Sequence, residues 1–484
     1  MKRNLIIWMT LCCFANILSV NNLILSVPLC IIEHAFFFCL FFQKKFFYAF
    51  LSFILFSSAA LEVHSFVLQS ESFALYSFFN VPVLHGMLAT FDILLLCIAV
   101  LPLVKAAIRN NKYASLFVKW MIWFLVVGGV ISVITFILDD NGIRSSGLYP
   151  KVTILELLSY LYRFAVITIA IVYIYHYDKE RQLGVFCQFL LISLVFSGLM
   201  GGLLGFEGYY GDDITMLSSL AVGFTPCLFL FTDKNEHRLL SLISAIIIVL
   251  ACFIYPSVIG SKWYLVVGVS ILCAVYRYLG FKTARPLVYI AVASLFAVPL
   301  IMNFVTSKID SSSYVSYKLT QALRTINIFG AGSVEDWSED MGQSPLFRFD
   351  ELHNTLIEYT EKPVYALTGK GFGGTTRHHT SLLSWETKAG AFSKEEVSMG
   401  AYYEMHESLA QIFLRHGFPG VFFLFLFLFL FFKSIPDSPW ALCALLWLFF
   451  YWDYGSSFTL GMVSVVFVLK SLDRRKCNVG NINQ

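Results

Sequence analysis

The stretch YYEMHESLAQIFLRHGFPGVFFLFLFLFLFFK, residues 402–433, places a polar segment directly before a long run of Phe and Leu. An apolar helix of about 20 residues is long enough to cross a hydrocarbon core of about 30 Å. We therefore predict a membrane span near residues 412–433, with the preceding His and Glu side chains close to the membrane surface.

Comparable apolar runs recur along most of the 484 residues, of which 58% are hydrophobic and only 13% are charged. Soluble domains carry about 25% charged residues. The alternating pattern of a β-barrel is absent, so we predict an all-α transmembrane bundle of about 12–14 spans. The expected spans lie near 5–20, 23–42, 46–68, 83–104, 117–138, 154–175, 183–204, 214–232, 239–256, 262–279, 286–304, 412–433, 437–452 and 456–470.

The basic residues of the short loops predict the orientation, because such residues favour the cytoplasmic side. With both termini inside, the cytoplasmic connections are the basic ones, at 43–45, 105–113, 176–182, 233–238, 277–285 and 473–476. The chain then divides into an N-terminal bundle (1–304), a large periplasmic loop (305–411) and C-terminal helices with a short tail (412–484). Long loops of this kind commonly carry function.

Two amphipathic helices are expected in the loop, over 313–329 and 345–363. In the second, Leu346, Phe349, Leu352 and Leu356 fall at helical spacing and predict its buried face. The segment GKGFGG (369–374) formally matches a dinucleotide fingerprint, but no βαβ pattern surrounds it. It is either a turn that requires glycine or a nest of backbone N–H groups that binds an anion.

The histidines do not form a recognisable metal site. HESLA lacks the second His of a zincin motif at Ala410, and His406 and His416 lie about 80° apart around a helix. RHH at 377–379 has no ligand pattern around it, so we expect no metal. His406 is either part of a polar collar at the membrane surface or a group that accepts a proton.

Two basic residues stand out in or beside the spans. Lys262 lies in a short outer turn and is either a snorkelling anchor or a cation facing a lipid-linked phosphate. Arg163 lies mid-span, where a charge costs at least about 2.5 kcal/mol, so it needs a partner or an aqueous cavity. Asp92, Glu62 and His64 are its candidate partners.

Residues 206–433 resemble the O-antigen ligase and polymerase superfamily, whose members are inner-membrane glycosyltransferases of the GT-C type. The resemblance rests on the outer turn GSK (260–262), on LFRFDELHNTLIEYTEKPVYALTGKGFGG in the loop, and on MHESLAQIFLRHGFPG before the next span. These members use an undecaprenyl-diphosphate-linked glycan as donor on the periplasmic face, so the resemblance implies metal-independent, cofactor-independent glycosyl transfer at that side of the membrane.

The resemblance implies a role for each matching residue. His406 takes the place of the essential loop histidine and is expected to be the base. Lys262 and Arg348 match basic residues near the diphosphate, and Arg163, Arg377 or Arg144 can complete that clamp. Glu407 and Glu404 are expected to orient the histidine or bind sugar hydroxyls. Glu407 stands where the family commonly has Asn, and Lys262 where it has Arg.

The acceptor distinguishes the possible activities. We favour a polymerase that joins repeat units on the lipid carrier; the alternative is a ligase that transfers the glycan to lipid A-core or to protein. The expected partners are the glycan donor, the glycan acceptor and the bilayer, with a chain-length regulator as a further candidate and no nucleic acid. A flippase or transporter is the alternative from another class, but it predicts two repeated halves, and the sequence shows no repeat.

Overall fold

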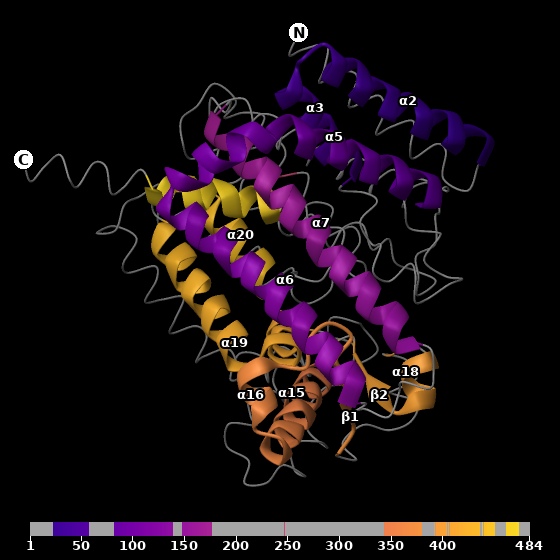
Figure 1. Cartoon of the computed structure of the whole chain (residues 1–484), viewed down its shortest axis with the longest axis vertical. Helices are drawn as coiled ribbons and strands as arrows, with labels where there is room; N and C mark the ends of the chain where they lie inside the picture. The colour runs from indigo at the N-terminus through magenta and orange to yellow at the C-terminus, as the bar shows by residue number, and fades with distance from the viewer. Residues whose placement is uncertain are drawn as a thin grey trace, which may run out of the picture. The chain divides into compact units, whose positions relative to one another are not determined.

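The structure of the protein is a computed structural model. The described residues are 23–57, 82–138, 148–176, 246, 343–379, 392, 394–403, 405, 407–435, 438, 440–450 and 461–473. They are almost entirely helical, with one short pair of strands (Figure 1). The helical character and the long apolar helices confirm a helical membrane protein.

The chain forms two compact units. Unit 1 combines residues 1–125, 157–274 and 425–484, and unit 2 combines residues 126–156 and 275–424. Three long helices, α6 (Lys112–Leu138), α7 (Leu148–His176) and α19 (Ser408–Ser434), contribute residues to both units.

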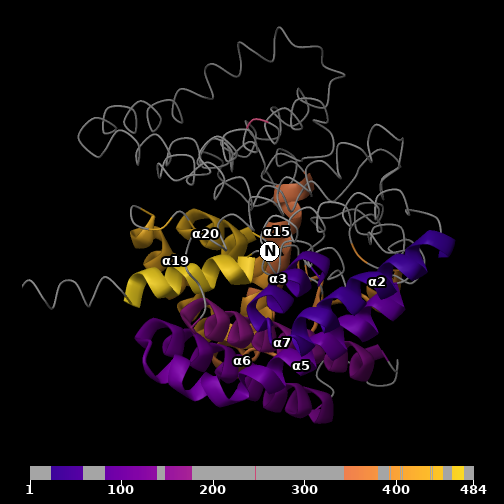
Figure 2. The same cartoon turned by 90° about the horizontal axis from the view of Figure 1, so that it is seen from above.

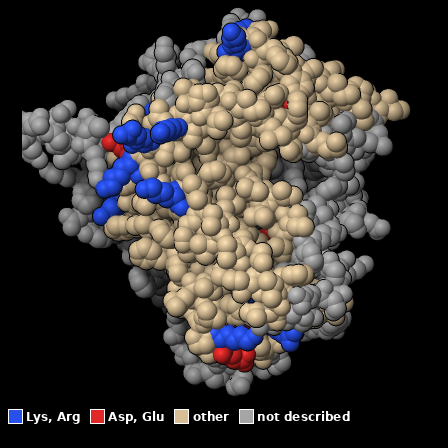
Figure 3. All heavy atoms as spheres, in the orientation of Figure 1, with Lys and Arg blue, Asp and Glu red and all other residues tan. Residues whose placement is uncertain are grey.

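Four described helices are long and apolar enough to cross a membrane. These candidate spans are Met87–Arg109, Lys112–Leu138, Val152–Tyr175 and Ser408–Ser434. Each contains one of the spans expected from the sequence, or nearly all of it. The expected spans at 5–20 and between 183 and 304 lie outside the described residues, apart from residue 246. Large apolar side chains such as Val126, Ile137 and Phe429 are exposed, and the described surface in Figure 3 carries wide areas without charge. Such a surface is suited to lipid.

Unit 1 begins with three helices that pack on one another, α2 (Leu23–Phe42), α3 (Phe46–Ser57) and α5 (Pro82–Arg109) (Figure 2). A buried side-chain hydrogen bond joins two of them, because His34 Nδ1 lies 2.6 Å from Asp92 Oδ2. Unit 1 also contains α20 (Ala441–Phe450) and a helix over residues 461–473.

Asp473 ties three parts of unit 1 together. Its carboxylate accepts the backbone N–H of Tyr113 in the first turn of α6 at 3.1 Å and the hydroxyl of Tyr175 near the end of α7 at 3.0 Å. A carboxylate at a helix N-terminus satisfies N–H groups that have no partner within the helix. The last described helix is thereby joined to the start of α6 and the end of α7.

Unit 2 contains the loop elements: α15 (Gln343–Glu361), α16 (Val364–Thr368), β1 (Thr376–Arg377), α18 (Lys394–Met399) and β2 (Ala401–Tyr402). The two strands pair antiparallel, with Thr376 opposite Tyr402. Helix α15 confirms the amphipathic helix expected at 345–363, whereas the helix expected at 313–329 lies outside the described residues. The first part of α19 completes the unit.

The segment LRHGFPG interrupts α19. Gly417 has φ 61° and ψ −158°, and this non-helical residue separates the helix into two parts. Pro419 follows two residues later and fits the first turn of the second part, where a missing N–H costs nothing. The first part of α19 therefore ends at Gly417, and the Phe-rich second part begins after it.

Candidate functional site

The Gly-rich segment 369–374 is held tightly between other elements of unit 2. The N–H groups of Lys370 and Gly371 donate to carbonyl oxygens of α19, at 2.8 and 3.0 Å. The next two donors bind side chains: Phe372 N donates to Ser132 Oγ and Gly373 N donates to Glu156 Oε2, both at 2.6 Å. These N–H groups are engaged within the chain, so the interpretation as an anion nest for a ligand is not supported.

The glycines of this segment are required by close backbone contacts. Gly369 has φ 65°, and a Cβ there would overlap the backbone carbonyl of Arg415. Gly371 has φ 74°, and a Cβ there would overlap backbone atoms of Gly128 and Ser132. Because other residues rarely adopt this conformation and have no room here, the alternative of a turn that requires glycine is confirmed.

A buried ion pair secures the same segment. Arg415 on α19 donates from Nη2 to Glu156 Oε1 on α7 at 2.6 Å, and both side chains are almost fully buried. The two oxygens of Glu156 therefore bind Arg415 and Gly373 N–H respectively. A buried carboxylate needs such partners, so Glu156 connects α7, α19 and the Gly-rich segment.

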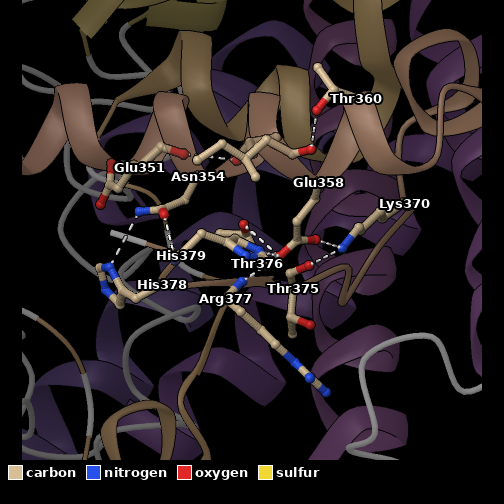
Figure 4. Close-up of polar contacts among 12 residues, drawn as sticks. Glu351, Asn354, Glu358, Thr360, Lys370, Thr375, Thr376, Arg377, His378 and His379 are labelled. Atoms are coloured by element: carbon tan, nitrogen blue, oxygen red, sulfur yellow. Dashed lines mark hydrogen bonds and ion pairs between the residues drawn. The ribbon is translucent and has the colours of Figure 1, made fainter. Parts of the chain in front are cut away.

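Glu358 on α15 contacts Lys370 of the Gly-rich segment and the residues that follow this segment (Figure 4). Its carboxylate pairs with Lys370 Nζ and accepts the N–H of Arg377 at 2.5 Å and the hydroxyl of Thr376 at 3.1 Å. His379 Nε2 lies 3.2 Å away. Burial raises the pKa of Glu358, but the Lys370 ammonium and the hydrogen bonds outweigh it, so the net pKa lies below its usual value.

A second carboxylate on α15 binds a histidine of the loop. Asp350 Oδ2 lies 2.8 Å from His378 Nδ1, and Asp350 is fully buried. Asn354 accepts the N–H of His379 at 2.7 Å (Figure 4). No group of three His, Cys, Asp or Glu side chains that can hold a metal occurs among the described residues.

The buried face of α15 therefore differs from the one predicted. Leu346 is buried as expected, but Leu356 is exposed, and Asp350, Glu351 and Asn354 are buried. Leu346 and Leu352 pack in apolar clusters, but another part of the surface that α15 contacts is polar and presents Lys370, His378 and backbone N–H groups. Apolar spacing alone does not predict that polar part. Paired polar groups can be buried where unpaired ones cannot.

The segment that leads to position 406 is fixed by two buried polar side chains. Gln411 accepts the N–H of Met405 at 2.7 Å and donates to the carbonyl of Tyr403 at 3.1 Å. Glu396 on α18 accepts the N–H of Tyr403 at 3.0 Å. Both side chains form hydrogen bonds with the backbone shortly before His406, at Tyr403 and Met405.

Two of the predicted site residues meet directly after position 406. Arg348 Nε on α15 lies 2.5 Å from Glu407 Oε1, and both side chains are partly exposed. The structure thus brings a predicted diphosphate-binding cation and a predicted orienting carboxylate together. His406 itself lies outside the described residues, as do Glu404, Lys262, Glu62, His64 and Arg144.

The remaining candidates lie elsewhere. Arg377 uses its backbone N–H on Glu358, while its exposed side chain points away from that carboxylate in Figure 4. Arg163 is buried in unit 1, where its guanidinium lies 5.1 Å from the ring centre of Tyr160. Asp92, which was a candidate partner of Arg163, pairs with His34.

Sequence reasoning missed Glu156, Glu358, Glu396 and Gln411. Glu156 carried a signal, because an acid within an apolar run such as VTILELLSYLYRF needs a partner. The other three sit in a polar loop where charged residues are ordinary, so only the folded arrangement distinguishes them.

The chain matches no protein-family model, no curated protein and no solved structure.

Proposed function

We propose that the chain is a polymerase of the bacterial inner membrane that joins undecaprenyl-diphosphate-linked repeat units of a surface polysaccharide on the periplasmic face. The observation that carries this proposal is the Arg348–Glu407 pair. Glu407 directly follows position 406 in the sequence and binds a cation suited to phosphate, and Gln411 holds the backbone at Met405 just before that position. His406 is then the base, and Arg348 belongs to the diphosphate clamp.

The contacts of unit 2 agree with placing the loop and three helix ends on one side of the membrane. The loop contacts α6 at Ser132 and Thr135, and α7 at Thr153 and Glu156. It also contacts the first part of α19 through Leu414 and Arg415. The sequence assigns these three helix ends and the loop to the same side of the membrane. A loop on the other side would be unable to contact all three ends.

The proposed chemistry needs two kinds of group. An acceptor hydroxyl attacks C1 of the donor sugar, the bond between C1 and the diphosphate oxygen breaks, and undecaprenyl diphosphate leaves with the bonding electrons. His406 accepts the proton of the hydroxyl. Arg348 stabilises the negative charge that develops on the leaving diphosphate.

Deletion of the gene, followed by electrophoresis of the surface polysaccharide, tests this proposal. A polymerase predicts that the ladder collapses to a single repeat unit on its acceptor. A ligase predicts an undecorated acceptor with accumulated lipid-linked polymer. An unchanged glycan contradicts both activities and leaves the transporter class.

A further inference from the structure

Three acid–base pairs of unit 2 differ strongly in burial. The exposed fractions of the basic and acidic side chains are 3% and 1% for Arg415–Glu156, 4% and 11% for Lys370–Glu358, and 30% and 15% for Arg348–Glu407. Further contacts also hold one member of each of the first two pairs, since Lys370 donates to the carbonyl of Thr375 at 2.7 Å and Glu156 accepts Gly373 N–H. Arg348 is the most exposed of the three basic side chains, and Glu407 is the most exposed of the three acids.

Burial decides which pair can open. Removing one partner from a buried pair leaves the other charge buried without a counter-ion, which changes the folding equilibrium by more than about a hundredfold. Separating a partly exposed pair changes the equilibrium between its paired and separated forms by no more than about fivefold, because water solvates both groups. An incoming anion can therefore replace Glu407 at Arg348, whereas Arg415 and Lys370 stay with their own carboxylates.

We propose that Glu407 is a resident anion that occupies the phosphate position at Arg348 and exchanges with the diphosphate of the lipid-linked donor. The identity of the ligand rests on the proposed function, whereas the exchange itself rests on the ion pair. A guanidinium can present two parallel N–H donors to a phosphate. When the glycan has been transferred, the carboxylate returns to Arg348 and displaces the diphosphate product, so Glu407 weakens binding and favours release.

Equilibrium binding of inorganic diphosphate to the purified full-length protein in detergent, measured by calorimetry, tests the exchange. Glu407→Gln removes the competing charge and is expected to bind the probe up to about fivefold more tightly than the wild type. Arg348→Gln is expected to abolish this binding. Glu361→Gln is the matched control, because Glu361 is an exposed acid at the end of the same helix, and it is expected to bind as the wild type does.

Equal or weaker binding by Glu407→Gln, equal tightening by Glu361→Gln, unchanged binding by Arg348→Gln, or no binding by any variant overturns the proposal. In a glycan transfer assay, Glu407→Gln should lower both the KM for the donor and kcat, because release becomes slow. The binding assay contains no sugar or lipid. A normal glycan in the deletion strain would therefore refute the polymerase, while tighter binding by Glu407→Gln would still establish the exchange.

Discussion

Glu156 is the residue whose removal should damage unit 2 most. Its carboxylate binds Arg415 Nη2 and Gly373 N–H, both at 2.6 Å, and the pair is almost completely buried. In Glu156→Ala the Arg415 guanidinium keeps its charge but loses this carboxylate, and Gly373 loses its acceptor. The perturbation therefore acts on α19 and on the Gly-rich segment at once.

The magnitude follows from the two losses. Leaving one member of a buried ion pair without its partner costs about 3–5 kcal/mol, and an unsatisfied buried N–H costs about 1–3 kcal/mol. The two losses share one carboxylate and do not simply add, so we expect a decrease in unfolding free energy of about 3–5 kcal/mol. The double variant Glu156→Leu with Arg415→Met should lose less, because no charge remains buried.

Unfolding of the purified protein in mixed micelles, followed by circular dichroism during a titration with dodecyl sulfate, measures these differences. Glu361→Gln, at an exposed site, should change the unfolding free energy by less than about 0.5 kcal/mol. If Glu156→Ala costs less than about 1 kcal/mol, or if the double variant is the less stable of the two, the buried-pair reasoning is refuted.

Three further predictions follow from the loop contacts. Gly369→Ala should lower the unfolding free energy by at least about 1–2 kcal/mol, because φ is 65° and a Cβ overlaps Arg415; Gly129→Ala, where a Cβ meets no atom within 4 Å, should not destabilise the protein in the same titration. The pKa of Glu358 is lowered from 4.5, so its contribution to stability is complete above pH 4.5 and is lost as the pH falls through the lower folded pKa. Glu358→Gln should abolish that part of the pH dependence, and an unchanged acid limb would contradict it. The Gln411 side chain accepts the N–H of Met405, so Gln411→Met should speed amide hydrogen exchange at Met405. Unchanged protection of that N–H would show that this hydrogen bond does not hold the backbone before position 406.

The membrane helices could be predicted from the sequence because hydrocarbon imposes a simple rule on composition and length. The apolar runs near 83–104, 117–138, 154–175 and 412–433 correspond to the long helices α5, α6, α7 and α19. The break at Gly417 could also be predicted, because Gly and Pro interrupt helices for local reasons. The total number of spans and the orientation remain predictions.

The polar contacts of the loop could not be predicted, because they join residues far apart in sequence. Glu156 and Arg415 are separated by 259 positions, and the sequence around each residue does not identify the other as its partner. Apolar spacing placed Leu356 inside, although it is exposed. The Gly-rich segment was ambiguous for the same reason: whether its N–H groups bind a ligand or the chain depends on what packs against them.

Glu407 has a contact that its sequence position does not predict. The resemblance implies Asn at this position and an orienting role for Glu407 next to His406. The contact with Arg348 at 2.5 Å supplies a physical reason for a carboxylate, because Asn carries no charge with which to compete for a guanidinium.

Reconstitution of the purified protein in liposomes with a single substrate, the undecaprenyl-diphosphate-linked repeat unit, tests the proposed polymerase activity. A polymerase whose base is His406 should give a ladder of lipid-linked oligomers from the wild type and no ladder from a folded His406→Ala variant. A wild-type protein that is folded but leaves the repeat unit unchanged, or a His406→Ala variant that forms the full ladder, would contradict it.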